Sequence, residues 1–110
     1  MTSAEVVQAQ LDAYNARDAQ RLTSFYAANC ELTDLKGTVT LQGRAALYQR
    51  FSKTFTDHPQ NRAWSVNRIV VNNIVVDHEV GERSPGGERF ELVAIYTIEG
   101  NQITRLAMGN

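Results

Sequence analysis

Two alternating apolar runs that meet at Asn72–Asn73 constrain the fold of this chain more than any other feature. Asparagine tolerates a positive φ angle, so this pair suits a two-residue turn between antiparallel strands. Such a turn places Arg68 opposite Asp77 and fixes which side chains share a face of the hairpin. The two predicted faces are Trp64, Val66, Arg68, Val70, Val75, Asp77 and Glu79 on one side, and Ser65, Asn67, Ile69, Val71, Ile74, Val76, His78 and Val80 on the other. Both faces are substantially apolar, and each therefore needs a covering layer.

The chain is too short to cover both faces by itself. With 110 residues it can form one compact domain, and only three helices are predicted. We therefore expect helices on one face and a second copy of the chain on the other, giving a homodimer through the sheet. The oppositely charged pair Arg68 and Asp77 is expected on this dimer face. Asp77 and Glu79 are neighbours on one strand, so they are not expected to act as the paired carboxylates of a glycosidase.

The spacing of apolar residues, together with residues typical of helix caps and turns, predicts the order of the helices and strands. Thr2 and Glu5 have the spacing of a capping box, and an apolar stripe follows over a helix of residues 3–16. Asp18 is expected to cap a short second helix that ends near Asn29. Next come two strands, which begin at Cys30 and Val39 and are joined by a turn at Gly37. A third helix follows Gly43 and ends before Asp57. Four strands complete the chain: one that ends at residue 71, one that begins at residue 74, and two over about 88–98 and about 102–108. This order is an α+β arrangement, ααββαββββ, in which a curved antiparallel sheet wraps around helices within a single domain of residues 1–110.

Charge and cysteine content exclude several classes of function. Eleven Lys and Arg residues are balanced by twelve Asp and Glu residues, and the net charge of −1 leaves no basic surface for nucleic acid. The longest apolar run is Leu92 to Tyr96, which is far too short to span a membrane. The single cysteine, Cys30, excludes an internal disulfide and fits a reducing cytoplasm. Two distant histidines without clustered ligands predict no metal site, and no cofactor is expected.

Several segments in this order resemble the NTF2-like superfamily, and most closely its SnoaL-like and ketosteroid-isomerase-like branch. The segments that carry the resemblance are Val6–Gln8, Asn15–Asp18, Phe25 through Thr33-Asp34, Gly43–Ala46, Asn67–Val71 and Val75–Glu79. The resemblance covers essentially the whole chain. It implies a cone-shaped fold with an apolar pocket at its open end, which a dimer partner often completes. The superfamily holds isomerases, polyketide cyclases, dehydratases, hydrolases, transport factors and non-catalytic binding domains, so fold alone does not select a function.

Asp34 is the first candidate for a catalytic residue. It shares strand parity with Cys30 and Leu32, so it is expected to point into an apolar cavity as a general base. The resemblance places Asp34 at the position of the carboxylate that moves a proton in ketosteroid isomerase. It also places Gln10 and Ala94 where that enzyme has its two oxyanion donors, so both donors are changed. The alternative role of Asp34 is structural, in which its carboxylate accepts backbone hydrogen bonds in the turn toward Gly37.

His78 is the second catalytic candidate, because the resemblance turns its face of the strand toward the pocket, where imidazole could act as acid or base. Its alternative role is a hydrogen bond to Asn67 across the sheet. Tyr96 is expected opposite Thr104 and beside Leu106 and Met108, where it either lines the pocket or only packs. The residues expected to line the ligand pocket are Gln10, Tyr14, Phe51, Phe55, Val76, Val80, Tyr96, Leu106 and Met108.

Three functions fit these observations. The first is an isomerase-like or cyclase-like enzyme that needs no cofactor and uses acid and base chemistry on a hydrophobic small molecule. The second is a module that binds such a molecule without turning it over, which the changed donor positions favour. The third is a domain whose only function is dimerisation through its sheet. The sequence leaves open whether the protein is an enzyme.

Overall fold

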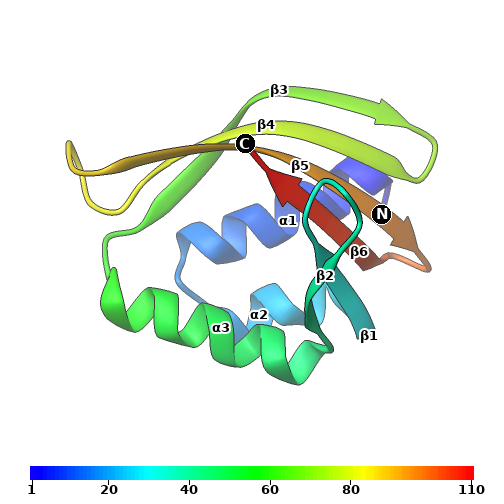
Figure 1. Ribbon diagram of the computed structural model, residues 1–110, viewed down its shortest axis with the longest axis horizontal. Helices are drawn as coiled ribbons and strands as arrows, with labels where there is room; N and C mark the ends of the chain where they lie inside the picture. The colour runs from blue at the N-terminus through cyan, green and yellow to red at the C-terminus, as the bar shows by residue number, and fades with distance from the viewer.

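A computed structural model describes residues 1–110 as three helices and one six-stranded sheet. The elements are α1 (Ser3–Asn15), α2 (Ala19–Ser24), β1 (Tyr26–Thr33), β2 (Val39–Gln42), α3 (Arg44–Asp57), β3 (Arg62–Val71), β4 (Ile74–Glu82), β5 (Arg89–Glu99) and β6 (Gln102–Gly109). The curved sheet arches over the helices, with α1 beneath β3 and β4 and α3 on the far side of α2 (Figure 1). The predicted α+β order of elements is confirmed.

The helices begin where the sequence places their caps. The Thr2 side chain accepts a hydrogen bond from the Glu5 amide at 3.1 Å, and the Glu5 carboxylate accepts one from the Thr2 amide at 2.7 Å. Asp18 caps α2 through the Arg21 amide at 3.0 Å. Gly43 precedes α3 with a φ of 93°, a conformation that glycine adopts without steric cost.

The second helix is shorter than the sequence predicts. It ends at Ser24 rather than near Asn29, and β1 begins at Tyr26. Tyr26 pairs with Ile103 of the last strand, and the Ile103 amide donates to the Phe25 carbonyl at 2.7 Å. Pairing with a distant strand therefore overrides the helical propensity of this segment, which local sequence cannot show.

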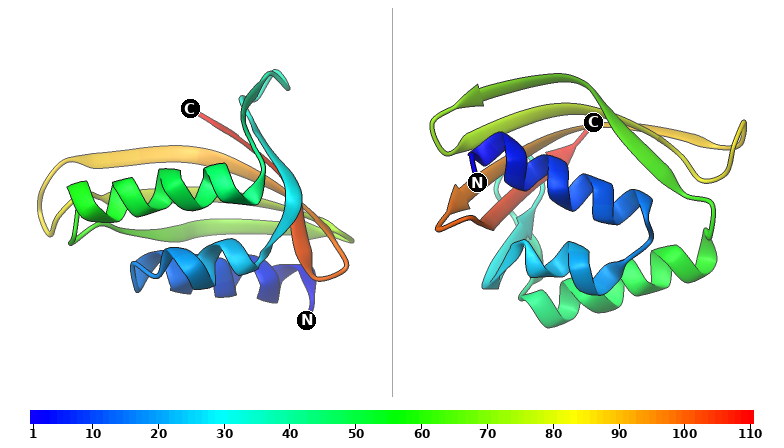
Figure 2. Two further views of the ribbon diagram at one scale, coloured as in Figure 1. Left: turned by 90° about the horizontal axis from the view of Figure 1, so that it is seen from below. Right: turned by 180° about the vertical axis from the view of Figure 1, so that it is seen from behind.

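The strands are ordered β2-β1-β6-β5-β4-β3 across the sheet. The last four strands form the predicted antiparallel meander, whereas β1 and β6 run parallel. A bulge near Thr97 shifts the pairing of the last hairpin, so Tyr96 lies opposite Leu106 rather than Thr104. Figure 2 shows that the sheet is curved and that the helices lie on its concave side.

The hairpin around Asn72–Asn73 has the predicted register as far as Asn67. Arg68 lies opposite Asp77 and Asn67 opposite His78, but a bulge at Val66 then places Ser65 opposite Glu79. Because a bulge adds one residue to one strand only, Trp64 shares a face with Val80 and His78, whereas the sequence predicts that it shares one with Arg68 and Asp77. Asn72 has the expected positive φ, 54°.

The two faces of this hairpin are exchanged relative to the prediction. Val75, Asp77 and Glu79 point toward the helices and are buried, whereas His78 points outward and is exposed. Arg68 binds Asp77 through Nε–Oδ1 at 2.6 Å and Nη2–Oδ2 at 2.8 Å, and its Nη1 donates to Gln8 of α1 at 3.0 Å. The predicted ion pair is thus present beneath α1, and the prediction that it lies on a dimer face is wrong.

The core lies between the concave face and the helices. Its fully buried members include Val6 and Val7 of α1, Leu22 of α2, and Tyr26 and Ile103, which join the first and last strands. No helix combines the length and apolar character needed to cross a lipid bilayer.

Candidate functional site

A cavity of about 360 Å³ opens between the concave face of the sheet, α1 and α3. Twelve of the twenty residues that line it are hydrophobic. At about 30 Å³ for each water-sized group, it has room for roughly a dozen such groups. Phe51 of α3 forms one wall, and Tyr96, Leu106 and Met108 of the sheet form another. Most of the wall is therefore apolar, and its few polar groups decide what the cavity can bind or do.

Glu79 is the buried acid of the cavity. It lies on the concave face of β4 with 7% of its surface exposed, and its Oε2 accepts a hydrogen bond from the Tyr96 hydroxyl at 2.7 Å. Burial raises the pKa of Glu79 to about 7, against the lowering effect of the Tyr96 hydrogen bond. The charge of Asp77 raises this pKa further, while Arg68 lowers it. A carboxyl group with a pKa near 7 can both accept and return a proton at neutral pH.

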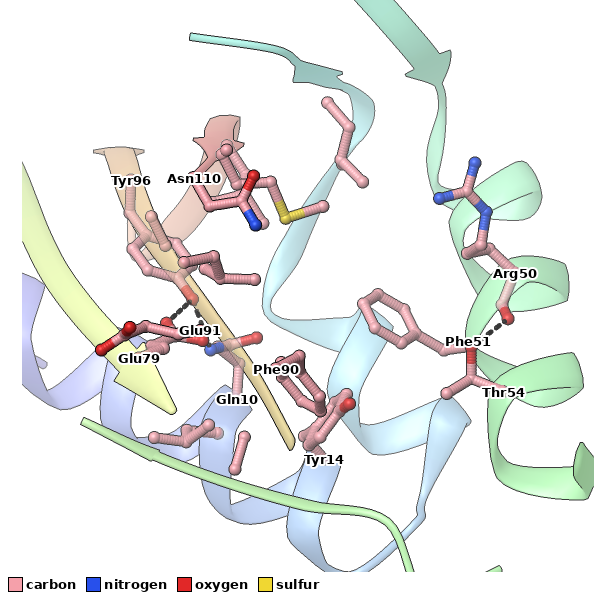
Figure 3. Close-up of a pocket in the computed structure, with 18 of the residues that line it drawn as sticks. Gln10, Tyr14, Arg50, Phe51, Thr54, Glu79, Phe90, Glu91, Tyr96 and Asn110 are labelled. Carbon is pink, nitrogen blue, oxygen red and sulfur yellow. Dashed lines mark hydrogen bonds between the residues drawn. The ribbon is translucent and has the colours of Figure 1, made fainter. Parts of the chain in front are cut away.

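A directional chain of hydrogen bonds ends at Glu79 (Figure 3). Since Tyr96 donates its only proton to Glu79, its oxygen must accept the hydrogen bond from Nε2 of Gln10, at 3.3 Å. That orientation leaves Oε1 of Gln10 to accept from the Tyr26 hydroxyl at 3.1 Å. The Gln10 amide carries a second N–H beyond the one used by Tyr96, and Gln10 lines the cavity. No hydrogen bond of the protein uses this N–H.

A second polar chain joins α1 to the end of β4. Asn61 is fully buried, and its Oδ1 accepts a hydrogen bond from Nη1 of Arg83 at 3.2 Å. Because a guanidinium group can only donate, this contact fixes the Asn61 amide so that Nδ2 donates to the Tyr14 hydroxyl. The Tyr14 oxygen is thus an acceptor, and its own proton is used by no other group of the protein. Burial raises the pKa of Tyr14, while Asn61 and the charge of Arg83 lower it.

Aromatic rings separate these two polar chains. Tyr14 contacts Phe51 and Phe55 edge to face, with ring centroids 5.8 and 5.3 Å apart. Phe51 lines the cavity, whereas Phe55 packs behind Tyr14 and Phe51 and does not form part of the wall. In Figure 3, Gln10, Glu79 and Tyr96 gather on one side and Tyr14 and Phe51 on the other.

Asp34 does not lie on the cavity wall. Its Oδ1 accepts hydrogen bonds from the amides of Lys36 at 2.9 Å and Thr38 at 3.0 Å, so it stabilises the turn between β1 and β2. The expected position in the cavity is wrong because β1 ends at Thr33 and Asp34 begins the turn, so the alternation of strand faces does not extend to its side chain. The alternative role of Asp34, as a turn residue, is the one present in the structure.

His78 also lies outside the cavity. It is on the convex face, where its Nε2 contacts the Glu91 carboxylate at 2.5 Å rather than Asn67. Val76 and Val80 share this face, so neither contributes to the cavity wall. The cavity does bring together Gln10, Tyr14, Phe51, Tyr96, Leu106 and Met108 from the expected pocket residues.

Glu79 and Arg83 line the cavity and Asn61 supports it, although the sequence pattern predicts none of them as a site residue. The sequence did hold one signal for Glu79, because it shares a strand face with Val75 and that face is the one that the helices cover. No sequence signal pointed to Asn61 or Arg83, because they meet only through contacts between distant elements. No group of three or more His, Cys, Asp or Glu side chains is arranged to hold a metal ion.

The comparisons with known proteins agree with this architecture. A family model described as a SnoaL-like domain matches residues 7–106. No curated protein matches the chain. An uncharacterised cystatin-fold protein from Novosphingobium aromaticivorans is 27% identical with a TM-score of 0.90, and the alignment covers 100% of this chain and 99% of that protein.

Two more distant solved structures share the fold. A provisionally assigned polyketide cyclase from Sinorhizobium meliloti is 20% identical with a TM-score of 0.79, and the alignment covers 99% of this chain and 100% of that one. A hypothetical protein with a ketosteroid-isomerase-like fold from Catenulispora acidiphila, solved with trimethylamine, is 17% identical with a TM-score of 0.74, covering 96% and 85% of the two chains. At these identities the likeness concerns the fold alone.

Proposed function

Since the chain belongs to the SnoaL-like domain family, within the NTF2-like superfamily, we propose that it is an acid–base enzyme in which Glu79 moves a proton on a hydrophobic carbonyl compound. The observation that carries this proposal is the Glu79 carboxyl group, buried in the cavity wall with a pKa of about 7. The catalytic role first expected for Asp34 passes to Glu79, because Asp34 is bound to its own turn. No cofactor takes part in the proposed reaction.

The proposed reaction is a proton transfer between two positions of one substrate. The Glu79 carboxylate removes a proton from the carbon next to a carbonyl group, and the electron pair of that C–H bond passes to the carbonyl oxygen. The free N–H of Gln10 donates a hydrogen bond to this oxygen as its charge develops. Glu79 then returns the proton to another carbon or to the oxygen, so an isomer or enol forms with no net gain or loss of atoms.

Exchange of solvent deuterium into a ketone tests this proposal without knowledge of the natural substrate. The probe is 2-tetralone, a two-ring ketone with about a dozen non-hydrogen atoms, comparable to the room in the cavity. We expect the protein to accelerate exchange at the carbon next to the carbonyl, measured by proton NMR. A general acid–base group contributes on the order of 100-fold or more, so Glu79→Gln is expected to lower the rate by about that factor.

Asp34→Asn is the matched control, because it removes a carboxylate and keeps the oxygen that accepts the turn hydrogen bonds. We expect its exchange rate to equal that of the parent protein. Equal rates for the parent and Glu79→Gln proteins would refute the role of Glu79. If Asp34→Asn lowered the rate instead, the original assignment to Asp34 would be the better one.

We also propose that the protein is a homodimer through the convex face of the sheet, as a single SnoaL-like domain of residues 1–110 in a reducing compartment such as the cytoplasm. The support is a row of apolar side chains on this face that are exposed to solvent in the single chain. Ile69, Val71 and Val93 are 55%, 61% and 37% exposed. Contiguous apolar surface of this kind is typical of protein–protein contacts.

A further inference from the structure

The arginines of the protein differ in whether they have a carboxylate partner. Arg62 and Arg89 both bind Glu82, Arg68 binds Asp77, and Arg105 binds Glu31. The two arginines that line the cavity, Arg50 and Arg83, have no carboxylate within 4.0 Å. The arginines left without a carboxylate partner therefore include both of those that a bound molecule would meet.

Arg83 is held in a fixed position despite having no counter-ion. Its guanidinium lies over the Phe90 ring at 4.5 Å from the centroid, and one of its N–H groups is bound to Asn61. Gly81 makes room for that ring, since a Cβ atom at this position would lie 2.0 Å from Phe90 Cζ. A half-buried guanidinium that is stacked and oriented in this way keeps several N–H donors for a planar acceptor.

The groups around Arg83 include a further hydrogen-bond donor and few carboxylates that could bind its guanidinium. The Tyr14 hydroxyl is joined to Arg83 through Asn61 and retains a free proton. Arg50 of α3 also lines the cavity, but it is exposed and its side chain points away from Tyr14 in Figure 3. Of the two acidic residues in the wall, Glu91 has its carboxylate bound to His78 on the convex face, and Glu79 accepts the hydrogen bond of Tyr96. Burial raises the pKa of Tyr14, and the charge of Glu79 still reaches this hydroxyl and raises the pKa further. The Arg83 side of the cavity is thus a set of hydrogen-bond donors with positive charge.

We propose that the molecule bound in this cavity is an apolar carboxylate, whose carboxylate group is held by Arg83 and whose apolar body reaches toward Glu79. Arginine forms paired hydrogen bonds to a planar carboxylate, which a neutral amide or ester cannot match. Only the orientation of the ligand, with its apolar body toward Glu79, rests on the proposed function. Binding of the carboxylate itself needs neither Glu79 nor turnover.

Three probes of nearly the same shape and different charge test the proposal. They are 2-naphthylacetate, which is anionic, 2-naphthylacetamide, which is neutral, and 2-(2-naphthyl)ethylamine, which is cationic. Titration calorimetry is expected to give a dissociation constant for the carboxylate on the order of tenfold lower than for the amide, since hydrogen bonds between charged partners are stronger. The amine is expected to bind most weakly. Equal binding of carboxylate and amide, or no carboxylate binding at millimolar concentration, would overturn the proposal.

Replacement of Arg83 tests whether this residue causes the preference for the carboxylate probe over the amide. Arg83→Met keeps an apolar stem over Phe90 and is expected to remove the preference for the carboxylate without changing amide binding. Arg21→Met is the matched control, because Arg21 also lies over a phenylalanine ring, Phe25, but outside the cavity. Arg83→Lys keeps the charge and is expected to restore part of the preference, which separates a loss of charge from a loss of folding. An unchanged preference in Arg83→Met would refute the assignment.

The same titration separates this inference from the proposed function. Glu79→Gln is expected to retain or increase the preference for the carboxylate, because it removes negative charge from the cavity and leaves Arg83 in place. A protein that prefers the carboxylate but fails to exchange deuterium would be a binding module with the inferred specificity. A protein that exchanges deuterium without the preference would keep the proposed function and lose this inference.

Discussion

Two carboxylates on one strand face show how strongly environment decides the chemistry of a residue. Asp77 is fully buried and accepts two hydrogen bonds from one edge of the Arg68 guanidinium, whereas Glu79, two residues later, has only the Tyr96 hydroxyl as a close donor. Strand parity predicts that both point the same way. It cannot predict that the cavity begins at Glu79, because the residues that enclose it come from α1, α3 and β5.

The raised pKa of Glu79 predicts a specific dependence of stability on pH. The pKa is about 7 in the folded protein and near 4.5 in the unfolded chain, so the folded state holds this proton more strongly. The resulting stabilisation is fully present below about pH 4.5 and is lost as the pH rises through about 7, for a total on the order of 3 kcal/mol. Urea unfolding at pH 5 and pH 8 should show a smaller loss of free energy of unfolding in Glu79→Gln than in the parent protein. Parallel curves for the two proteins would contradict the raised pKa.

At the scale of elements, the sequence predicts what local chemistry determines and misses what strand irregularities change. The caps at Thr2 and Asp18 and the register beside Asn72 were predictable because each depends on neighbours in sequence. Bulges have no comparable signal, and the one at Val66 changed which side chains share a face. The end of a strand is equally hard to place from sequence, and β1 ends at Thr33, so Asp34 lies in the turn.

The turn between β1 and β2 provides a test of that role. Asp34→Ala removes the acceptor of two backbone hydrogen bonds, and we expect the free energy of unfolding to fall by about 1–2 kcal/mol. Asp34→Asn retains an acceptor oxygen and should lose much less. Thermal and urea unfolding of both variants would measure the difference. Equal stability of the two variants and the parent would show that the turn does not depend on this carboxylate.

At the scale of the whole molecule, the convex face is the main surface left without a covering layer. The sequence predicted that one face of the sheet would need another molecule, and it named the wrong face because it could not place α1. The face that remains exposed carries Ile69, which pairs with Val76 and through it with Ile95. An apolar row across three strands is a suitable contact for a two-fold partner.

Light scattering at micromolar concentration tests the dimer. Ile69→Glu places a charge at the β3 end of this row and is expected to reduce the mass from that of a dimer to that of a monomer. Val39→Glu makes the same kind of change at an exposed position on β2, at the opposite edge of the sheet, and is expected to leave the dimer intact. A monomeric mass for the parent protein would contradict the proposed dimer.

The parallel pairing of β1 with β6 has a consequence for how the chain acquires its structure. Tyr26 and Ile103 are partners although 76 intervening residues separate them, so β1 cannot complete its hydrogen bonding until β6 has emerged from the ribosome. Contacts between such distant segments slow folding, because a long loop must close before they form. During synthesis, the meander of β3 to β5 and the hairpin of β1 with β2 are therefore free to pair early, while the other edge of β1 waits for β6.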